Sequence, residues 1–283
     1  MQEGTDSKAQ TTDLPKYGVV LSGGGALGFA HIGALMALEK AGIEISMVSG
    51  ASMGSIIGAM YASGIYPTAE AIRDFIKKDE LYKFHNIFNV NLFSLFNSRG
   101  MSDHKKVKKI LDVVLPNIET FEDLKKRSFA LSMTNFIDLK PEYVDSGDKL
   151  KEKIMASAAI PVVFKPVIIE GIAYVDGGIM NNLPIEPLKG RCQKIIMIDV
   201  MAGGRDELTS LKLEKIAYRA VMAMMKQMNI DRIAQADYYV RFEKLEKYNM
   251  FDFEKYNEIV NIGQKGMELY IKEHPELKEG IAG

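Results

Sequence analysis

The chain has 283 residues, of which 47% are hydrophobic and 26% charged, an ordinary composition for a globular protein with enough apolar material for a core. Its 36 basic and 37 acidic residues give a net charge of −1, whereas nucleic-acid-binding domains are usually distinctly basic. The composition therefore argues against a nucleic-acid partner. The single cysteine, Cys192, excludes an intramolecular disulfide and a cysteine-based zinc site, and we expect it to be a small buried hydrophobe.

No apolar run reaches the roughly 18 residues that a membrane-spanning helix needs. Residues 1–16 are polar and of mixed charge, unlike a signal peptide, and they predict a disordered tail. We therefore expect a cytoplasmic protein, unless a leader has been removed from the chain. Residues 17–283 contain no internal repeat and no sharp break in composition, which favours one domain. In that domain the motifs fall within 17–200, and a helical part follows at 205–275.

The chain order of the first ordered elements indicates the fold class. A short apolar run at 18–21 predicts a buried strand, and apolar residues at helical spacing predict a helix over 28–41. A second strand at 43–48 and a small-residue helix at 55–63 follow. Strand–helix–strand–helix is typical of a parallel sheet covered by helices, so we expect an α/β fold with three α/β/α layers and a mainly parallel central sheet.

The remaining elements continue this pattern. Ser102 predicts the N-cap of a helix that ends near residue 115. Further strands are expected at 129–134, 162–169, 172–175, 194–200 and 238–242, and further helices at 211–229 and 253–273. The methionine-rich face of the helix at 211–229 is expected to pack in the core rather than to form a membrane or partner surface.

The strongest local feature is the segment GASMG at residues 50–54, between the second strand and the second helix. A serine in such a turn needs small neighbours, because its backbone is strained and larger side chains would collide. The turn exposes the Ser52 hydroxyl at a helix N-terminus, where the Met53 amide and the helix dipole can stabilise negative charge. The pattern alone arises by chance, as a tight small-residue turn. Its place between strand and helix favours a nucleophile.

The segment GGGALG at residues 23–28, here called the glycine loop, joins the first strand to the first helix. Its spacing fits a dinucleotide fingerprint, which needs an acidic residue about 20 positions later, at the end of the second strand. Glu44 stands at the start of that strand instead. The loop also fits an oxyanion hole, with free glycine amides, or a simple tight connection. Beside Ser52, the oxyanion hole is the favoured interpretation.

A catalytic serine needs a base, and histidine is the usual one. None of the four histidines stands in a turn that would present a base, and His31, on the first helix, is expected to be a packed or capping residue. The four are His31, His85, His104 and His274. Asp176 is the better candidate, because a strand delivers it to a turn with Gly177 and Gly178 and desolvation can raise its pKa. An ordinary Asp-Gly turn is the alternative.

Together these segments resemble the patatin-like phospholipases, in particular their short bacterial members. The resemblance covers 17–200 and rests on the glycine loop, the GASMG turn, the segment ASAAIP at 156–161, and the DGG turn at 176–178, in that order. It implies that Ser52 is the nucleophile and Asp176 its general base, in a dyad without histidine. Catalysis would proceed through an acyl-enzyme that water hydrolyses. No metal and no cofactor are implied.

The resemblance also assigns backbone roles. The implied oxyanion donors are the amides of Gly23, Gly24, Gly25 and Met53, and the implied motif glycines are Gly28, Gly50, Gly54, Gly177 and Gly178. One departure is Leu27, where the family often has Arg or Lys. The backbone donors do not depend on that side chain.

The substrate is expected to be a lipid or another ester, with peripheral membrane contact and oligomeric state left open. The aromatic stretch within 81–101 could line an acyl channel, form a lid, or pack as a loop on the core, and the sequence does not separate these. Two other functions remain as alternatives. One is a catalytically silent lipid-binding or regulatory protein on the same fold, and the other is a nucleotide-binding α/β protein that uses the glycine loop.

Overall fold

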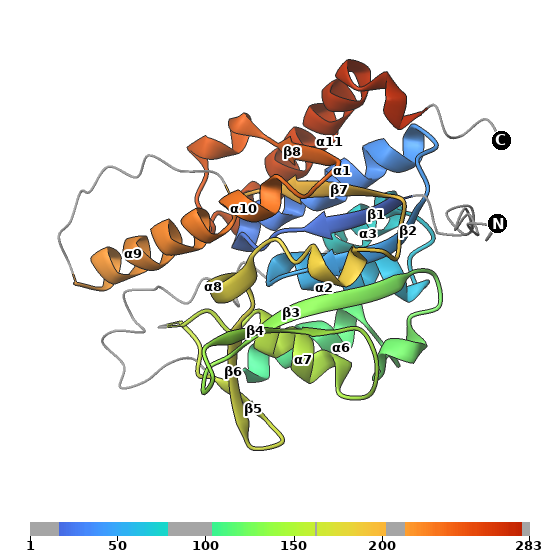
Figure 1. Cartoon of the computed structure of the whole chain (residues 1–283). Coiled ribbons are helices and arrows are strands. Elements are labelled where there is room, and N and C mark those ends of the chain that lie inside the picture. Colours follow the sequence, from blue (N-terminus) through green and yellow to red (C-terminus); the bar gives the residue numbers. More distant parts are fainter. Residues whose placement is uncertain (1–16, 79–103, 162, 202–212, 279–283) are drawn as a thin grey trace, which may run out of the picture.

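The computed structural model describes residues 17–78, 104–161, 163–201 and 213–278 (Figure 1). The expected tail at 1–16 and the aromatic stretch at 81–101 lie outside the described residues. So does Ser102, the expected helix cap, and the helix itself begins at Lys105 with His104 in the cap position. No helix in the described part of the chain is both long and apolar enough to cross a bilayer.

A central sheet of eight described strands forms the middle of the molecule, in the order β5-β6-β3-β2-β1-β7-β8, with β4 paired to β3. Strands β3, β2, β1, β7 and β8 are parallel, and the pairs β3–β4, β3–β6 and β5–β6 are antiparallel. The strands are β1 (Tyr17–Leu21), β2 (Ile45–Gly50), β3 (Ser128–Asn135), β4 (Lys140–Val144), β5 (Val167–Ile169), β6 (Ile172–Asp176), β7 (Lys194–Asp199) and β8 (Tyr238–Arg241). The expected α/β fold with a mainly parallel sheet is confirmed.

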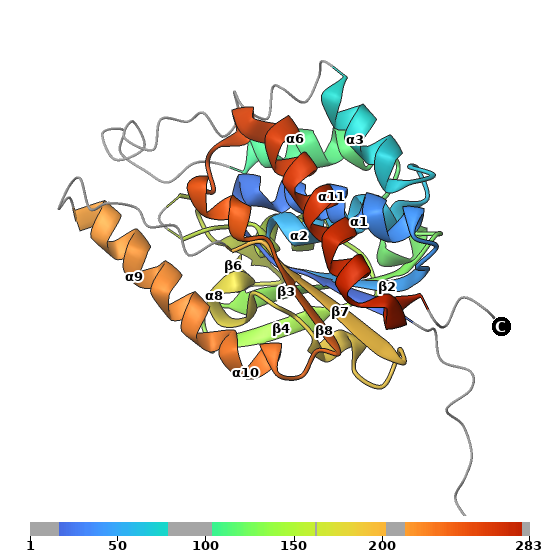
Figure 2. The same cartoon turned by 90° about the horizontal axis from the view of Figure 1, so that it is seen from above.

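Helices flank this sheet (Figures 1 and 2). They are α1 (Phe29–Lys40), α2 (Met53–Ser63), α3 (Ala69–Lys77), α6 (Lys105–Val114), α7 (Leu150–Ser157), α8 (Gly178–Asn181), α9 (Leu213–Met228), α10 (Ile230–Ile233) and α11 (Tyr256–Glu273). Short 3-10 turns lie at Gly25–Gly28, Phe121–Asp123, Glu186–Leu188, Glu243–Lys247, Phe253–Lys255 and Pro275–Leu277. The sequence patterns missed β4, α3 and α7, and they extended β5 back to residue 162, whereas β5 begins at Val167.

Alternation along the buried strands supplies a core on each face of the sheet. Val19 and Leu21 of β1 join the larger cluster with α1, α2 and α11, whereas Val20 points into a smaller cluster with the segment 183–188. Cys192 belongs to the smaller cluster and is buried, as expected. A parallel strand covered on both faces reads as a continuous apolar run, which explains the short VVL stretch of β1.

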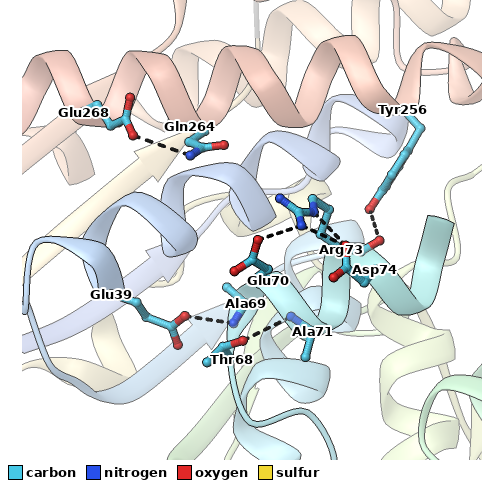
Figure 3. A network of polar contacts seen from close by, with 10 residues as sticks. All are labelled: Glu39, Thr68, Ala69, Glu70, Ala71, Arg73, Asp74, Tyr256, Gln264 and Glu268. Atoms are coloured by element: carbon cyan, nitrogen blue, oxygen red, sulfur yellow. Dashed lines mark hydrogen bonds and ion pairs between the residues drawn. The ribbon is translucent and has the colours of Figure 1, made fainter.

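The helix layer is held by close packing and by polar contacts between helix ends. A Cβ atom at Gly33 of α1 would overlap the carbonyl oxygen of Val260 in α11, so the two helices approach closely (Figure 2). The Glu39 carboxylate at the end of α1 accepts from the first amide of α3 at 2.9 Å, and the Tyr256 hydroxyl of α11 donates to the Arg73 carbonyl of α3 at 3.0 Å (Figure 3). These contacts fix α1, which follows the glycine loop.

Helix α9 departs from its expected burial. Met225 is buried and Met228 half-buried, whereas Ile216, Ala220 and Met224 on the same helix are exposed, Met224 by 65%. The prediction that this whole face packs in the core is therefore wrong for part of the helix. In both views one end of α9 extends beyond the other described helices (Figures 1 and 2).

Candidate active site

The register of β3 brings two distant segments together. Gly50 at the end of β2 pairs with Leu131, and Asp176 at the end of β6 pairs with Met133. Strand β4 occupies the other edge of β3 from Leu131 onward, so β2 and β6 share one edge. Strand β6 therefore pairs with β3 directly beyond the point where β2 ends, and the last residue of β6 lies beside the turn that carries Ser52.

Ser52 stands between β2 and α2 with φ 51° and ψ −123°, outside the regions that L-residues prefer. Such a conformation persists only where its surroundings hold it. Its amide donates to the Ser157 hydroxyl at 3.0 Å, and its carbonyl accepts from the amide and the hydroxyl of Ser55 at 2.9 and 2.6 Å. The strained backbone is thus held on both sides, which fixes the direction of the hydroxyl.

The glycines of the GASMG turn are required by close backbone approaches. A Cβ atom at Gly50 would lie 2.5 Å from the carbonyl carbon of Gly54, and one at Gly54 would overlap the carbonyl oxygen of Leu21. A third close contact involves the glycine loop, because a Cβ atom at Gly28 would lie 2.8 Å from the Cβ atom of Met53. Glycine at these positions lets α2 start directly against the end of β1.

The Ser52 hydroxyl donates a hydrogen bond to Oδ2 of Asp176 at 2.7 Å. The other carboxylate oxygen, Oδ1, accepts from the Gly178 amide at 2.8 Å. The backbone of Asp176 is held as well, since its amide donates to the Ala159 carbonyl and its carbonyl accepts from the Thr134 hydroxyl. Both residues are buried, with 6% of Ser52 and 3% of Asp176 exposed, so the expectation that the turn exposes the Ser52 hydroxyl is wrong.

Burial raises the pKa of Asp176 from an ordinary 3.8 to about 7, and the hydrogen bonds from Ser52 and Gly178 partly offset that rise. The cause is desolvation, which penalises the charged form of a carboxyl group. A carboxyl group with a pKa near neutrality can accept and release a proton at neutral pH, which is what a general base needs.

Gly177 and Gly178 are also positions where other atoms come too close to leave room for a side chain. A Cβ atom at Gly177 would lie 2.5 Å from the Ser132 hydroxyl, and one at Gly178 would lie 3.1 Å from Oδ1 of Asp176. The DGG turn is therefore a tightly enclosed turn that directs the carboxylate at Ser52, and not an ordinary exposed Asp-Gly turn.

The glycine loop lies against the serine turn, since a Cβ atom at Gly23 would stand 2.9 Å from the Cβ atom of Ser52. The Gly23 amide donates to Oδ1 of Asn182 at 3.0 Å, so in this arrangement it is directed at a protein side chain. Glu44, by contrast, is exposed and stands just before β2. The end of β2 that lies next to the glycine loop is at Gly50, about 20 Å further along the strand. The ribose-binding acid of a dinucleotide site therefore has no counterpart in Glu44.

The described histidines bind groups other than Ser52. Nε2 of His31 lies 2.8 Å from the Ser22 carbonyl, and burial lowers the pKa of this imidazole to about 4. His104 binds the Lys165 carbonyl, and His274 contacts a carboxylate two residues away. The fourth, His85, lies outside the described residues.

Sequence reasoning missed two polar side chains of this site, Ser157 and Asn182. Ser157 belongs to the ASAAIP segment, which carries part of the family resemblance but predicts no role for the serine, and Asn182 follows the DGG turn by a few residues. Each accepts one hydrogen bond from the backbone of a loop that is distant in the sequence, and no local sequence pattern predicts such a bond. Within the described ranges, no cluster of three acidic, histidine or cysteine side chains could hold a metal ion.

The sequence of this chain matches a known protein family and known relatives. A sequence profile described as patatin-like phospholipase matches residues 19–189, which include Ser52 and Asp176. The lysophospholipase nte1 of Aspergillus fumigatus is 30% identical over 191 residues, which make up 65% of this chain and 12% of that protein. This chain therefore corresponds to a small part of that relative.

Two solved structures resemble the fold. VipD from Legionella pneumophila superposes with a TM-score of 0.54 at 16% identity, covering 93% of this chain and 67% of that one. Human GIVD cytosolic phospholipase A2, in complex with methyl gamma-linolenyl fluorophosphonate, superposes with a TM-score of 0.50 at 12% identity, covering 98% and 60%. At such low identity these likenesses establish a shared fold.

Proposed function

Because the chain belongs to the patatin-like phospholipase family, we propose that it is a serine hydrolase that cleaves carboxylic esters of lipids with a Ser52–Asp176 dyad. The observation that carries this proposal is the 2.7 Å hydrogen bond from a strained, buried serine to a carboxylate whose pKa is about 7. No imidazole is needed between them, because desolvation already gives the carboxylate the proton affinity of a histidine.

The reaction follows from this geometry. As Oγ of Ser52 bonds to the ester carbonyl carbon, its proton passes to Oδ2 of Asp176, and the carbonyl oxygen becomes an oxyanion. Collapse of this intermediate breaks the bond to the alcohol, which leaves with the proton. Water then attacks the acyl-enzyme, gives its proton to Asp176, and releases the acid as Ser52 is reprotonated. One carboxylate thus acts as base and then acid in acylation, and as base and then acid again in deacylation, which accounts for both half-reactions.

The oxyanion would be stabilised by backbone amides at the start of α2 and in the glycine loop. Met53 is the first residue of α2, so its amide has no acceptor within the helix by position. The amides of Gly24 and Gly25 are the loop candidates, whereas the Gly23 amide would have to leave Asn182 in order to take part. We therefore assign Met53, Gly24 and Gly25 as donors and Gly23 as the anchored first residue of the loop.

A fluorophosphonate probe tests the dyad directly, and one such compound is part of the human phospholipase A2 complex described above. We expect wild-type protein to be labelled at Ser52 and to hydrolyse short nitrophenyl esters and lysophospholipids. Ser52→Ala should lose labelling and turnover together. A wild-type protein that folds but neither labels nor turns over these esters would support the alternative of a silent lipid-binding protein. Tight binding of NAD without esterase activity would support the nucleotide alternative.

Peripheral contact with a membrane is part of the proposal, through the exposed face of α9. Ile216, Ala220, Ala223 and Met224 form a stripe at helical spacing, and the helix sequence carries three basic residues against one acidic residue. The helix also lies beside the turn that carries the base, because Met225 packs against Gly178, whose amide binds the Asp176 carboxylate. Met224→Glu should weaken sedimentation with anionic vesicles. Leu269→Glu, which changes an apolar residue of α11 that is 56% exposed, should not.

A further inference from the structure

The glycine loop can position oxyanion donors only if its backbone is held in one conformation, and neither Ser52 nor Asp176 holds it. Three consecutive glycines at 23–25 lose more conformational freedom on folding than any other tripeptide, so their amides point in one direction only if outside contacts hold them. One contact closes the far end of this run, where the Ala26 amide donates to the Met250 carbonyl at 2.9 Å. The near end is held differently.

The peptide bond before Gly23 is bound at both of its polar atoms by buried side chains. Its carbonyl oxygen, which belongs to Ser22, lies 2.8 Å from Nε2 of His31, and its N–H donates to Oδ1 of Asn182 at 3.0 Å. Because a peptide bond is planar, two opposed hydrogen bonds to one unit prevent it from rotating. His31 is fully buried and Asn182 is 1% exposed, so water does not compete for either bond.

The protonation state of the imidazole follows from its partner. A carbonyl oxygen only accepts, so Nε2 of His31 carries the proton and donates, and Nδ1 is the bare nitrogen. Burial keeps this imidazole neutral by lowering its pKa to about 4. Among the described residues, neither Nδ1 of His31 nor Nδ2 of Asn182 has a hydrogen-bond partner. Each side chain is thus kept in the interior with one polar atom unsatisfied, which is costly unless the bond it does make is needed.

The position of Asn182 connects this peptide to the base. Its Oδ1 lies 2.5 Å from where a Cβ atom at Gly23 would be, and 2.6 Å from where one at Gly178 would be. Gly178 is the residue whose amide binds the Asp176 carboxylate. The Asn182 amide therefore fits between the donor loop and the base turn only because both carry glycine.

We infer that His31 and Asn182 are positioning residues that together clamp the peptide bond before Gly23 and thereby aim the amides of the glycine loop. The inference rests on the proposed esterase function, because it assigns a role in the same site. Neither residue touches the substrate or exchanges a proton in the reaction. The clamp acts on the oxyanion donors and leaves Ser52 and Asp176 as the reacting pair.

The test compares His31→Leu, Asn182→Leu and the double variant in ester turnover and in the rate of fluorophosphonate labelling. A displacement of about 1 Å in the donors costs on the order of 100-fold in rate, so each single variant should lower kcat by about that factor with little change in KM. Since both side chains hold one peptide unit, the double variant should be scarcely slower than either single one. The midpoint of the pH–rate profile should stay near that of wild type, because Asp176 is unchanged.

Conservative and matched variants make the test decisive. His31→Gln can place an amide N–H near the position of Nε2, so it should recover much of the activity lost in His31→Leu. His104→Leu removes another histidine–carbonyl hydrogen bond, one that does not involve the glycine loop, and Asn135→Ala removes another buried asparagine that accepts backbone N–H bonds, so both should keep kcat near wild type. If His31→Leu does not fold, Asn182→Leu and His31→Gln still carry the comparison.

Other results would overturn the clamp. Losses in kcat that multiply in the double variant would show that the two residues do not act on one peptide. A change confined to KM would show that the oxyanion donors are not affected, and equal activity of His31→Gln and His31→Leu would show that the hydrogen bond from His31 has no role. Failure of the proposed function is distinguishable, because wild-type protein would then neither label nor turn over esters. A wild type that is active and insensitive to these substitutions would refute only the clamp.

Discussion

Replacement of Asp176 by asparagine should lower activity and raise stability at the same time. The substitution keeps the size and shape of the side chain. An asparagine carbonyl can still accept from the Gly178 amide, and its NH₂ group can donate to the Ser52 hydroxyl, so both contacts of the carboxylate have a substitute. What is lost is the ability to accept a proton. We therefore expect the geometry of the site to survive while its base is removed.

The loss of activity has an expected size. A positioned general base contributes about 100- to 10,000-fold, and the Asp176→Asn variant should lose that much in kcat/KM for a nitrophenyl ester. In wild type, kcat/KM should rise with pH and level off above the pKa of Asp176, which is about 7. The variant should show a low rate without this rise.

The gain in stability follows from the same pKa. A carboxyl group whose pKa is about 7 in the folded state and about 3.8 in the unfolded state binds its proton more tightly when folded. That contribution to stability is fully present below pH 4 and is lost as the pH rises through 7. Three pKa units correspond to about 4 kcal/mol, which is the ceiling on what neutral asparagine can recover above pH 7. At pH 4 the two proteins should be nearly equal.

The assay is urea or thermal unfolding of wild type, Asp176→Asn and Ser52→Ala at pH 5 and pH 9. Ser52→Ala is the matched control, because it abolishes turnover but keeps the buried carboxyl group. Its stability should therefore still fall between the two pH values, whereas that of Asp176→Asn should fall less. An Asp176→Asn protein that is less stable than wild type at pH 9, or a wild-type rate that is independent of pH between 5 and 9, would refute the reasoning.

Three further substitutions test single contacts. Gly178→Ala would press a methyl group to 3.1 Å from the Asp176 carboxylate, and we expect at least a tenfold loss in ester turnover. Ser157→Ala removes the acceptor of the Ser52 amide and should cost about 1–3 kcal/mol in unfolding free energy, with slower fluorophosphonate labelling. Gly33→Ala would force α1 away from α11 and should cost about 1–3 kcal/mol by thermal unfolding, while the folded protein still labels.

Local features of this chain were predictable from sequence. The strand, the GASMG turn and the small-residue helix that hold Ser52 are consecutive, so their chemistry and geometry can be read together. The strand that ends at Asp176 was likewise evident from its apolar run and its two glycines. The choice of Asp176 over the histidines came from the kind of turn in which each residue stands. That choice remains a prediction, supported by the 2.7 Å contact with Ser52.

Features that depend on long-range pairing were not predictable. No pattern in the sequence near β3 indicates that one edge of this strand pairs first with β2 and then with β6. That pairing is nevertheless what brings Ser52 to Asp176. Strand β4 is short and half-exposed with a proline inside it, so it lacks the apolar pattern of a strand. The role of Asn182 depends on an amide 159 residues earlier in the chain. For α9, apolar spacing predicted burial, but spacing alone cannot tell whether another element covers the face.

A Ser–Asp dyad requires the fold to raise the pKa of its base, whereas a triad with histidine does not. An imidazole has a pKa near neutrality in water, so a triad needs only to orient its base. A carboxylate reaches the same pKa only when it is desolvated, and desolvation destabilises the folded protein in the pH range where the enzyme would work. The backbone of Asp176 is accordingly bound on both sides, by Ala159 and Thr134, so that relaxation toward water is opposed by several contacts at once. Weakening those contacts should therefore lower the pKa of Asp176 toward its ordinary value and reduce its strength as a base, before it unfolds the protein.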